Sequence, residues 1–451
     1  MAKSTTKDMT QGNPTKLIVG FALPMLLGYL FQQFYSMVDT IIVGQWLGVS
    51  SLAAVGSTGS INFMVIGFCM GICSGFAIPV AQRFGSGDYS SLRKFVANSI
   101  WLTIVFSVLM TALISYFCMD ILTIMNTPAD IIEEAYTYIF VIFLGIPITY
   151  LYNLTSGIIR ALGDSKSPVY FLVISSVLNI ILDIVSISVW GMGVEGPALA
   201  TVISQGISGV LCLVYMIKKF EILHIKRDEW AYDAHYAKIL CSMGVPMGLQ
   251  YSITAIGSVV LQTAVNGLGS AAVAAMTAAS KLSIFFSCPF DALGGTMATY
   301  AGQNVGAKKL DRIHSGIKAA TIIGVAYSIV ACGVLVLFGK QLVLLFMDAG
   351  KVEIIREAYR VLIYTSAFYP LLTIVNVFRF CIQGMGYSSF AILAGVCEMI
   401  GRAGVAFGLI PFLGFTAACL ANPAAWILAD AFLIPAYLRC HKKLQRAFAV
   451  K

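Results

Sequence analysis

One stretch constrains the fold of this 451-residue chain more than any other: the apolar run over residues 171–190. It is long enough to cross a bilayer as a single helix, yet it contains Asn179 and Asp183. These two side chains are four residues apart, so they share one face of a helix. A charge at the bilayer centre costs about 2.5–3.5 kcal/mol on insertion scales, so we expect Asp183 to face protein or water rather than lipid.

The composition is typical of a protein with many membrane helices. Hydrophobic residues make up 59% of the chain and charged residues only 11%, whereas a soluble domain carries about 25% charged residues. The cysteines form no CxxC pair and no zinc-binding spacing with histidine. The first apolar stretch is too long for a signal peptide and is expected to remain as a helix.

The apolar stretches predict an all-α membrane protein with twelve transmembrane helices, which places both termini on one side. The twelve predicted spans cover approximately residues 17–44, 51–82, 94–119, 131–159, 168–190, 196–218, 239–267, 272–301, 315–338, 355–382, 390–411 and 415–438.

The distribution of lysine and arginine predicts on which side of the membrane both termini lie. If the N-terminus is inside, the inside segments hold nearly all of these residues, including Lys3, Lys7 and Lys451 at the ends of the chain, and Arg379. The outside segments hold only Lys340, Lys351, Arg356 and Arg360. We therefore expect a multi-pass protein of the plasma membrane with both termini in the cytoplasm.

The chain contains an internal repeat. Pro147 precedes Gly163 by the same number of residues as Pro370 precedes Gly386. The spacing from Pro24 to Gln82 is likewise almost the same as that from Pro246 to Gln303.

The repeat predicts two pseudo-symmetric lobes of six helices each. The N-terminal lobe is residues 1–220, the cytoplasmic linker 221–238 and the C-terminal lobe 239–451. Both copies have the same orientation in the membrane, as in transporters that work by alternating access. Pro24, Pro147, Pro246 and Pro370 fall inside spans, where each can form a fixed kink or a moving hinge.

Polar residues in the first lobe form a candidate ion site. Asp39 lies in the first span, with Tyr35 and Gln32 one and two turns earlier on its face, and Thr201 and Gln205 lie in the sixth span. The candidate cation ligands are Asp39, Asn179, Asp183 and Thr201. Their oxygens suit sodium, and a buried acid pair can also carry a proton, so both ions remain open. The alternative is a purely structural polar cluster.

The second lobe does not repeat these acids. Counted from the repeat glycines, Ala406 stands in the place of Asp183 and Arg402 in that of Asn179. Glu398 and Arg402 are four residues apart and predict an ion pair, with a substrate or gating role as the alternative. The candidate substrate-cavity residues are Tyr35, Gln32, Gln205, Glu398 and Arg402. Roles for Asp291, Asp430 and Lys281 remain open.

The chain resembles the multidrug and toxic compound extrusion (MATE) family over nearly its whole length. The resemblance rests on ALP and VDT in the first span, Gln82 and Gly85 after the second, RALGDSKSP after the fourth and GQNVGA after the eighth. It implies export of organic, often cationic or amphipathic, compounds in exchange for protons or sodium. It also implies a cation site at Asp39, Asn179, Asp183 and Thr201.

Some branches of that family carry an acid in the seventh helix, where this chain has Gln250 and Tyr251. This departure argues against a second-lobe cation site of that type and favours the branch that includes the bacterial DNA-damage-inducible F proteins, which the chain resembles.

Two other functions fit the sequence less well. A flippase for a lipid-linked substrate would need a strongly basic cavity, but the predicted spans hold few basic residues. A membrane enzyme would need acidic or histidine motifs that the chain lacks. We expect a monomeric transporter of small organic molecules that contacts membrane lipid, has no enzymatic activity, takes no cofactor beyond its coupling ion and binds no nucleic acid.

Overall fold

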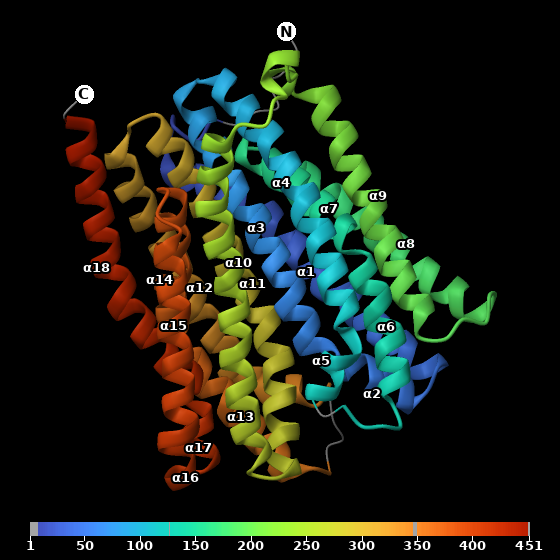
Figure 1. Ribbon diagram of the computed structural model, residues 1–451. Helices are drawn as coiled ribbons and strands as arrows, with labels where there is room; N and C mark the ends of the chain where they lie inside the picture. The colour runs from blue at the N-terminus through green and yellow to red at the C-terminus, as the bar shows by residue number, and fades with distance from the viewer. Residues whose placement is uncertain (1–7, 126, 346–349, 450–451) are drawn as a thin grey trace. The chain divides into compact units, whose positions relative to one another are not determined.

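The computed structural model describes residues 8–125, 127–345 and 350–449, so Lys3, Lys7 and Lys451 lie outside the described residues. All regular structure within these ranges is helical (Figure 1), which confirms the all-α prediction. The long helices are α1 (Pro14–Trp46), α3 (Gly59–Ser86), α4 (Tyr89–Tyr116), α8 (Ser167–Ser188), α9 (Glu195–Lys219), α10 (Ala234–Asn266), α11 (Ser270–Gly306), α12 (Leu310–Val343), α15 (Ser389–Gly404) and α18 (Ala421–Ala449).

Shorter helices complete the chain. They are α2 (Val49–Ser57), α5 (Cys118–Ile124), α6 (Ile132–Leu144), α7 (Ile146–Ala161), η1 (Glu221–Leu223), η2 (Arg227–Glu229), α13 (Val352–Ala367), α14 (Tyr369–Gly384), η3 (Val405–Leu409), α16 (Ile410–Leu413) and α17 (Phe415–Cys419). In the described part of the chain, 10 helices are long and apolar enough to cross a membrane, or up to 12 if each of two bent pairs is one span.

The bent pairs form where the sequence places a proline. Helices α6 and α7 meet at 45° and helices α13 and α14 at 52°. Pro147 and Pro370 lie at the first positions of the second helix of each pair, where a missing backbone donor is tolerated. The kinks predicted at these two prolines are therefore present. Pro24 and Pro246 instead lie within the continuous helices α1 and α10.

The described residues form two compact units that exchange half-helices. Unit 1 consists of Asp8 and Leu27–Gly248, and unit 2 of Met9–Leu26 and the described residues from Leu249 onward. Helices α1 and α10 thus each belong to both units, and each changes unit two residues after its proline. The predicted lobes did not include this exchange, and their boundaries at 220 and 239 stay a prediction.

Glycines hold the first half of α10 in unit 1. A Cβ atom built on Gly75 of α3 would lie 2.4 Å from the Cα of Gly244, and one built on Gly71 would lie 2.6 Å from the Cα of Gly248. No side chain fits at these distances, so the backbones of α3 and α10 touch. Glycine is required here because of this close approach.

The linker is bonded to α4. The carboxylate of Glu229, which is 3% exposed, accepts hydrogen bonds from Arg93 Nε at 2.5 Å, Arg93 Nη2 at 2.8 Å and Ser90 Oγ at 3.1 Å. The guanidinium of Arg93 is the main reason that the pKa of Glu229 is lowered to about 2. The backbone N–H of Asp233 also donates to Asn98 Oδ1 at 2.9 Å. These contacts fix the chain just before α10 begins.

We expect Glu229→Gln to destabilise the protein by about 1.5–3 kcal/mol at neutral pH, the contribution of hydrogen bonds to a charged group. The folded-state pKa lies below the usual value of about 4.3. The stabilisation is therefore present above that value and is lost as the pH falls toward the folded pKa. Thermal melting at neutral and acidic pH measures it. Asp228→Asn, at the exposed neighbouring acid, is the control and should change little. An equal effect of both variants would contradict the prediction.

The chain before α1 is fixed to unit 2 in the same manner. Met9 is fully buried, and its backbone N–H donates to Gln303 Oε1 at 2.9 Å. Its carbonyl oxygen accepts from Asn304 Nδ2 at 3.2 Å and from Arg312 Nη2 at 3.3 Å. Lys309 Nζ donates to the carbonyl oxygen of Thr10 at 2.9 Å. The segments that precede α1 and α10 are thus both fixed by side chains of the unit to which the following half-helix belongs.

Candidate cation and substrate site

Asp39 of α1 and Asp183 of α8 meet inside unit 1. Asp183 is 0% exposed, and the two carboxyl groups lie within hydrogen-bonding reach of each other. Among the described residues, no donor reaches either oxygen of Asp183 or Oδ1 of Asp39. Ionised carboxylates are acceptors only, and buried polar atoms without a partner are costly. A shared proton or a bound cation would supply what this pair lacks.

The other two predicted ligands lie beside the acid pair. Asn179 is one turn before Asp183 on α8, is 1% exposed and donates from Nδ2 to Thr201 Oγ1 of α9 at 3.4 Å. Its own Oδ1 has no donor among the described residues. The four predicted ligands therefore come together from α1, α8 and α9.

One neighbour of this site, Tyr138, was not among the predicted site residues. Tyr138 of α6 is buried and lies close enough to interact electrostatically with Asp39, Asp183 and Tyr35. A tyrosine in an apolar run carries no signal in a single sequence, because the same residue is common in ordinary helix packing.

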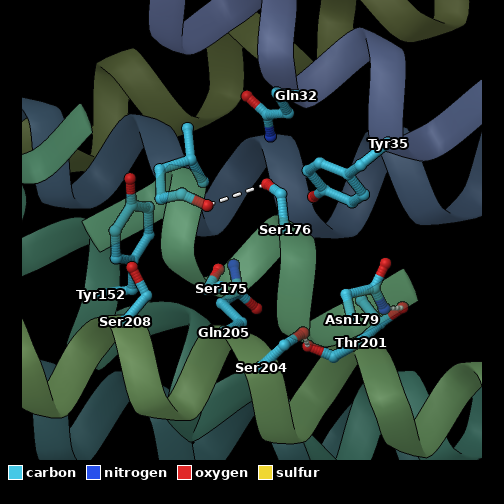
Figure 2. Close-up of a pocket in the computed structure, with 11 residues that line it drawn as sticks. Gln32, Tyr35, Tyr152, Ser175, Ser176, Asn179, Thr201, Ser204, Gln205 and Ser208 are labelled. Atoms are coloured by element: carbon cyan, nitrogen blue, oxygen red, sulfur yellow. Dashed lines mark hydrogen bonds between the residues drawn. The ribbon is translucent and has the colours of Figure 1, made fainter. Parts of the chain in front are cut away.

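A small polar cavity adjoins the site and contains the predicted cavity residues Gln32, Tyr35 and Gln205. Figure 2 shows side chains of α1, α8 and α9 converging on it. Its volume is about 20 Å³, and about 10–15 Å³ suffices for one water molecule. The lining residues are Gln32, Tyr35, Tyr152, Leu172, Ser175, Ser176, Asn179, Thr201, Ser204, Gln205 and Ser208.

Two serine hydroxyl groups of this cavity present acceptors. Ser176 Oγ donates to the carbonyl oxygen of Leu172 at 2.8 Å, and Ser204 Oγ donates to that of Ala200 at 2.7 Å. Since each hydroxyl has one proton, these two oxygens can only accept further bonds. A polar cavity of this size with two such acceptors suits a water molecule or a small cation, and a drug molecule would need the helices to separate.

The donor set fits sodium as well as a proton. Two carboxylates, one amide oxygen and one hydroxyl are the oxygen ligands that hard cations prefer. In the described part of the chain, no three histidine, cysteine, aspartate or glutamate residues gather in a way that could hold a metal ion. The candidate site therefore depends on two acids and neutral oxygens.

In unit 2 the predicted ion pair is present: Arg402 Nη2 lies 3.4 Å from Glu398 Oε2. Glu398 also pairs with Arg379 of α14. Arg379, which was counted with the inside segments, is 7% exposed. An acid on the neighbouring helix compensates it, and its assignment to the cytoplasmic side stays a prediction.

The other three residues whose roles were left open, Asp430, Asp291 and Lys281, belong to unit 2. Asp430 of α18 is 5% exposed, neither carboxylate oxygen has a donor among the described residues, and it interacts electrostatically with Arg379. Asp291 and Lys281 are exposed on α11.

Comparison with known proteins finds relatives over most of the chain. The model of the MatE family matches residues 24–185 and 246–407, two segments that begin at the repeat prolines. Probable multidrug resistance protein YoeA of Bacillus subtilis is 30% identical over 78% of this chain and 77% of its own. DNA damage-inducible protein F of Escherichia coli is 22% identical over 93% of this chain and 89% of its own.

The fold agrees as well. A crystal structure of MATE in complex with MaL6 has a TM-score of 0.92, with 22% identity, and the match covers 99% of this chain and 100% of that one. The family model covers more than half of the sequence and matches it twice. The chain therefore belongs to the MatE family, the multidrug and toxic compound extrusion transporters.

Proposed function

We propose that this chain is a cation-coupled antiporter that exports organic, often cationic or amphipathic, compounds by alternating access. Inward movement of a proton or a sodium ion drives the export. We place the coupling ion at Asp39 and Asp183, with Asn179 and Thr201 as neighbouring ligands. We expect the protein to act as a monomer in the plasma membrane with both termini in the cytoplasm, and to need no cofactor.

The observation that carries this proposal is the acid pair in unit 1. The buried carboxyl group of Asp183 lies beside the half-buried one of Asp39, and three of their four oxygens lack a donor among the described residues, so a proton or cation between them stabilises the approach of α1 to α8. When the ion leaves, repulsion between the carboxylates favours their separation. An ion that binds one arrangement more tightly than the other shifts the population toward it.

Drug exchange follows if the substrate uses the same region. In the present arrangement the cavity beside the acids is too small for a drug. Substrate binding between α1, α8 and α9 therefore requires the arrangement that the ion disfavours. The two ligands then compete, and competition is enough to couple their movements in opposite directions.

The charges of unit 2 bear on the alternative, a lipid-linked substrate. Arg379 adds a buried guanidinium that the sequence analysis did not count inside the membrane. It pairs with Glu398, however, and Asp430 lies nearby. The cluster is thus compensated internally, unlike the strongly basic cavity that a diphosphate group would require.

Purified protein in liposomes tests the proposal. We expect outward transport of ethidium when either a pH gradient or a sodium gradient, imposed separately, is directed inward. The gradient that drives transport identifies the coupling ion. Empty liposomes and dissipation of each gradient by an ionophore are the controls. Folded protein that moves no ethidium under either gradient would contradict the proposed drug export.

A further inference from the structure

The two units place different chemistry at corresponding positions of their fifth spans. Gly163 and Gly386 end the preceding helices with the same left-handed backbone, at φ 91° and φ 94°, and provide a common reference. Counted from these glycines, Asn179 of α8 corresponds to Arg402 of α15. Likewise, Asp183 corresponds to Ala406.

Asn179 and Arg402 each connect their own helix to the next span. In unit 1, Asn179 donates to Thr201, which joins α8 to α9. In unit 2, Arg402 Nε donates to Asn422 Oδ1 at 3.2 Å, which joins α15 to α18. The connection between the fifth and sixth spans is therefore kept, but in unit 2 it is made by a cation that belongs to the chain.

The two units also differ in how their buried charges are balanced. Unit 1 has the acid pair of Asp39, which is half-buried, and Asp183, which is 0% exposed, and no basic side chain among the described residues is bonded to either. Unit 2 lacks both acids and instead has two guanidinium groups, Arg379 and Arg402, that share Glu398. Both are 7% exposed. The acid pair of unit 1 needs a cation, whereas unit 2 already contains cations in its own side chains.

Arg402 does more than neutralise Glu398. Arg379 already pairs with this carboxylate and also interacts electrostatically with the buried Asp430. Two guanidinium groups thus balance two buried acids in unit 2, so that removing Arg402 would leave a buried acid uncompensated. Arg402 combines this charge with its bond to Asn422.

We propose that Arg402 is a tethered cation that occupies, in unit 2, the position corresponding to the coupling-ion site of unit 1. It is a positioning residue. It holds α15 against α18 at all times, whereas the free ion holds the helices of unit 1 together only while it is bound. Ion exchange is then confined to unit 1. The comparison with unit 1 rests on the proposed function.

Adding free guanidinium to a variant that lacks the Arg402 side chain tests this inference without relying on transport. We expect Arg402→Ala to lower the melting temperature of the purified protein by about 5–10 °C, since it leaves a buried charge cluster unbalanced. Guanidinium chloride at about 10 mM, far below denaturing concentrations, should restore at least half of the loss by binding in the vacated space. Tetramethylammonium chloride, whose cation is too large, should not.

The matched control is Arg360→Ala. It also breaks an ion pair in unit 2, that of Arg360 Nη1 with Glu357 Oε2 at 2.9 Å, but this pair is more exposed and has no counterpart in the ion site. Guanidinium should leave its melting temperature unchanged. If guanidinium protects Arg402→Ala no more than it protects this control, or if Arg402→Ala melts like the wild type, the inference is wrong.

A second pair of variants decides the matter if Arg402→Ala does not fold. Arg402→Lys retains a cation and should melt close to the wild type. Arg402→Met retains the length without the charge and should be clearly less stable. Equal stability of these two variants would overturn the tethered cation. Because melting does not depend on ethidium transport, this outcome is separate from the fate of the proposed antiport.

Discussion

Asp39→Asn and Asp183→Asn will each reduce gradient-driven ethidium transport to the level of empty liposomes. Asparagine keeps the size of the side chain but holds neither the charge nor the exchangeable proton. With one carboxylate left, the site loses the like-charge repulsion that separates the helices when the ion leaves. The double variant should be no worse than either single one, because residues that act as a unit are not additive. Initial rates in liposomes measure all three.

Two comparisons make this prediction specific. Asp120→Asn changes an exposed acid of α5 and should transport like the wild type. The melting temperatures of Asp39→Asn and Asp183→Asn should not fall below that of the wild type. Asp183 is a buried acid whose oxygens have no bonded donor, and Asp39 is a half-buried acid whose Oδ1 has none. Normal transport by Asp183→Asn would refute the assignment of the coupling site.

Gly75→Val should prevent the protein from reaching its native structure. The first added carbon would lie 2.4 Å from the Cα and 2.6 Å from the backbone nitrogen of Gly244. Backbone atoms cannot turn aside as a flexible side chain does, so α3 and α10 must move apart. Overpacking a core costs about 1–3 kcal/mol where side chains can adjust, and we expect more here. The yield of monodisperse protein and its melting temperature measure the effect.

Gly333→Ala provides the matched control. This glycine also lies inside a long helix, α12, but a Cβ atom there would meet nothing within 4 Å. Alanine is favoured over glycine in helices by about 0.5–1 kcal/mol, so this variant should be as stable as the wild type or slightly more so. Normal folding of Gly75→Val would show that the close contact between α3 and α10 is not required.

The span pattern and the all-α fold were predictable because they depend on local properties. Hydrophobic length decides whether a helix can cross the bilayer, and the spacing of prolines and glycines reveals the repeat. The half-helix exchange was not predictable. The residues on either side of Leu26 and Gly248 are equally apolar, and nothing in such a run states which neighbour it contacts.

The candidate site was predictable for a different reason. A buried acid is costly, so Asp39 and Asp183 were conspicuous in otherwise apolar spans. Their mutual contact and the neighbouring Tyr138 required the structure. The pairing of Arg379 with Glu398 was not predictable either, because it is a contact between separate helices. A single sequence shows the cost of a buried charge but not the partner that offsets it.

The shared helices α1 and α10 have a consequence for how the two halves of the chain depend on each other. A cut in the linker between residues 220 and 239 yields two fragments, but neither contains a complete unit. The N-terminal fragment carries Met9–Leu26, which packs with unit 2, and lacks the part of α10 that ends at Gly248 and packs with unit 1. Each fragment holds a piece of the other's core. The two halves of the chain thus exchange segments, as the subunits of a domain-swapped dimer do, but within one polypeptide.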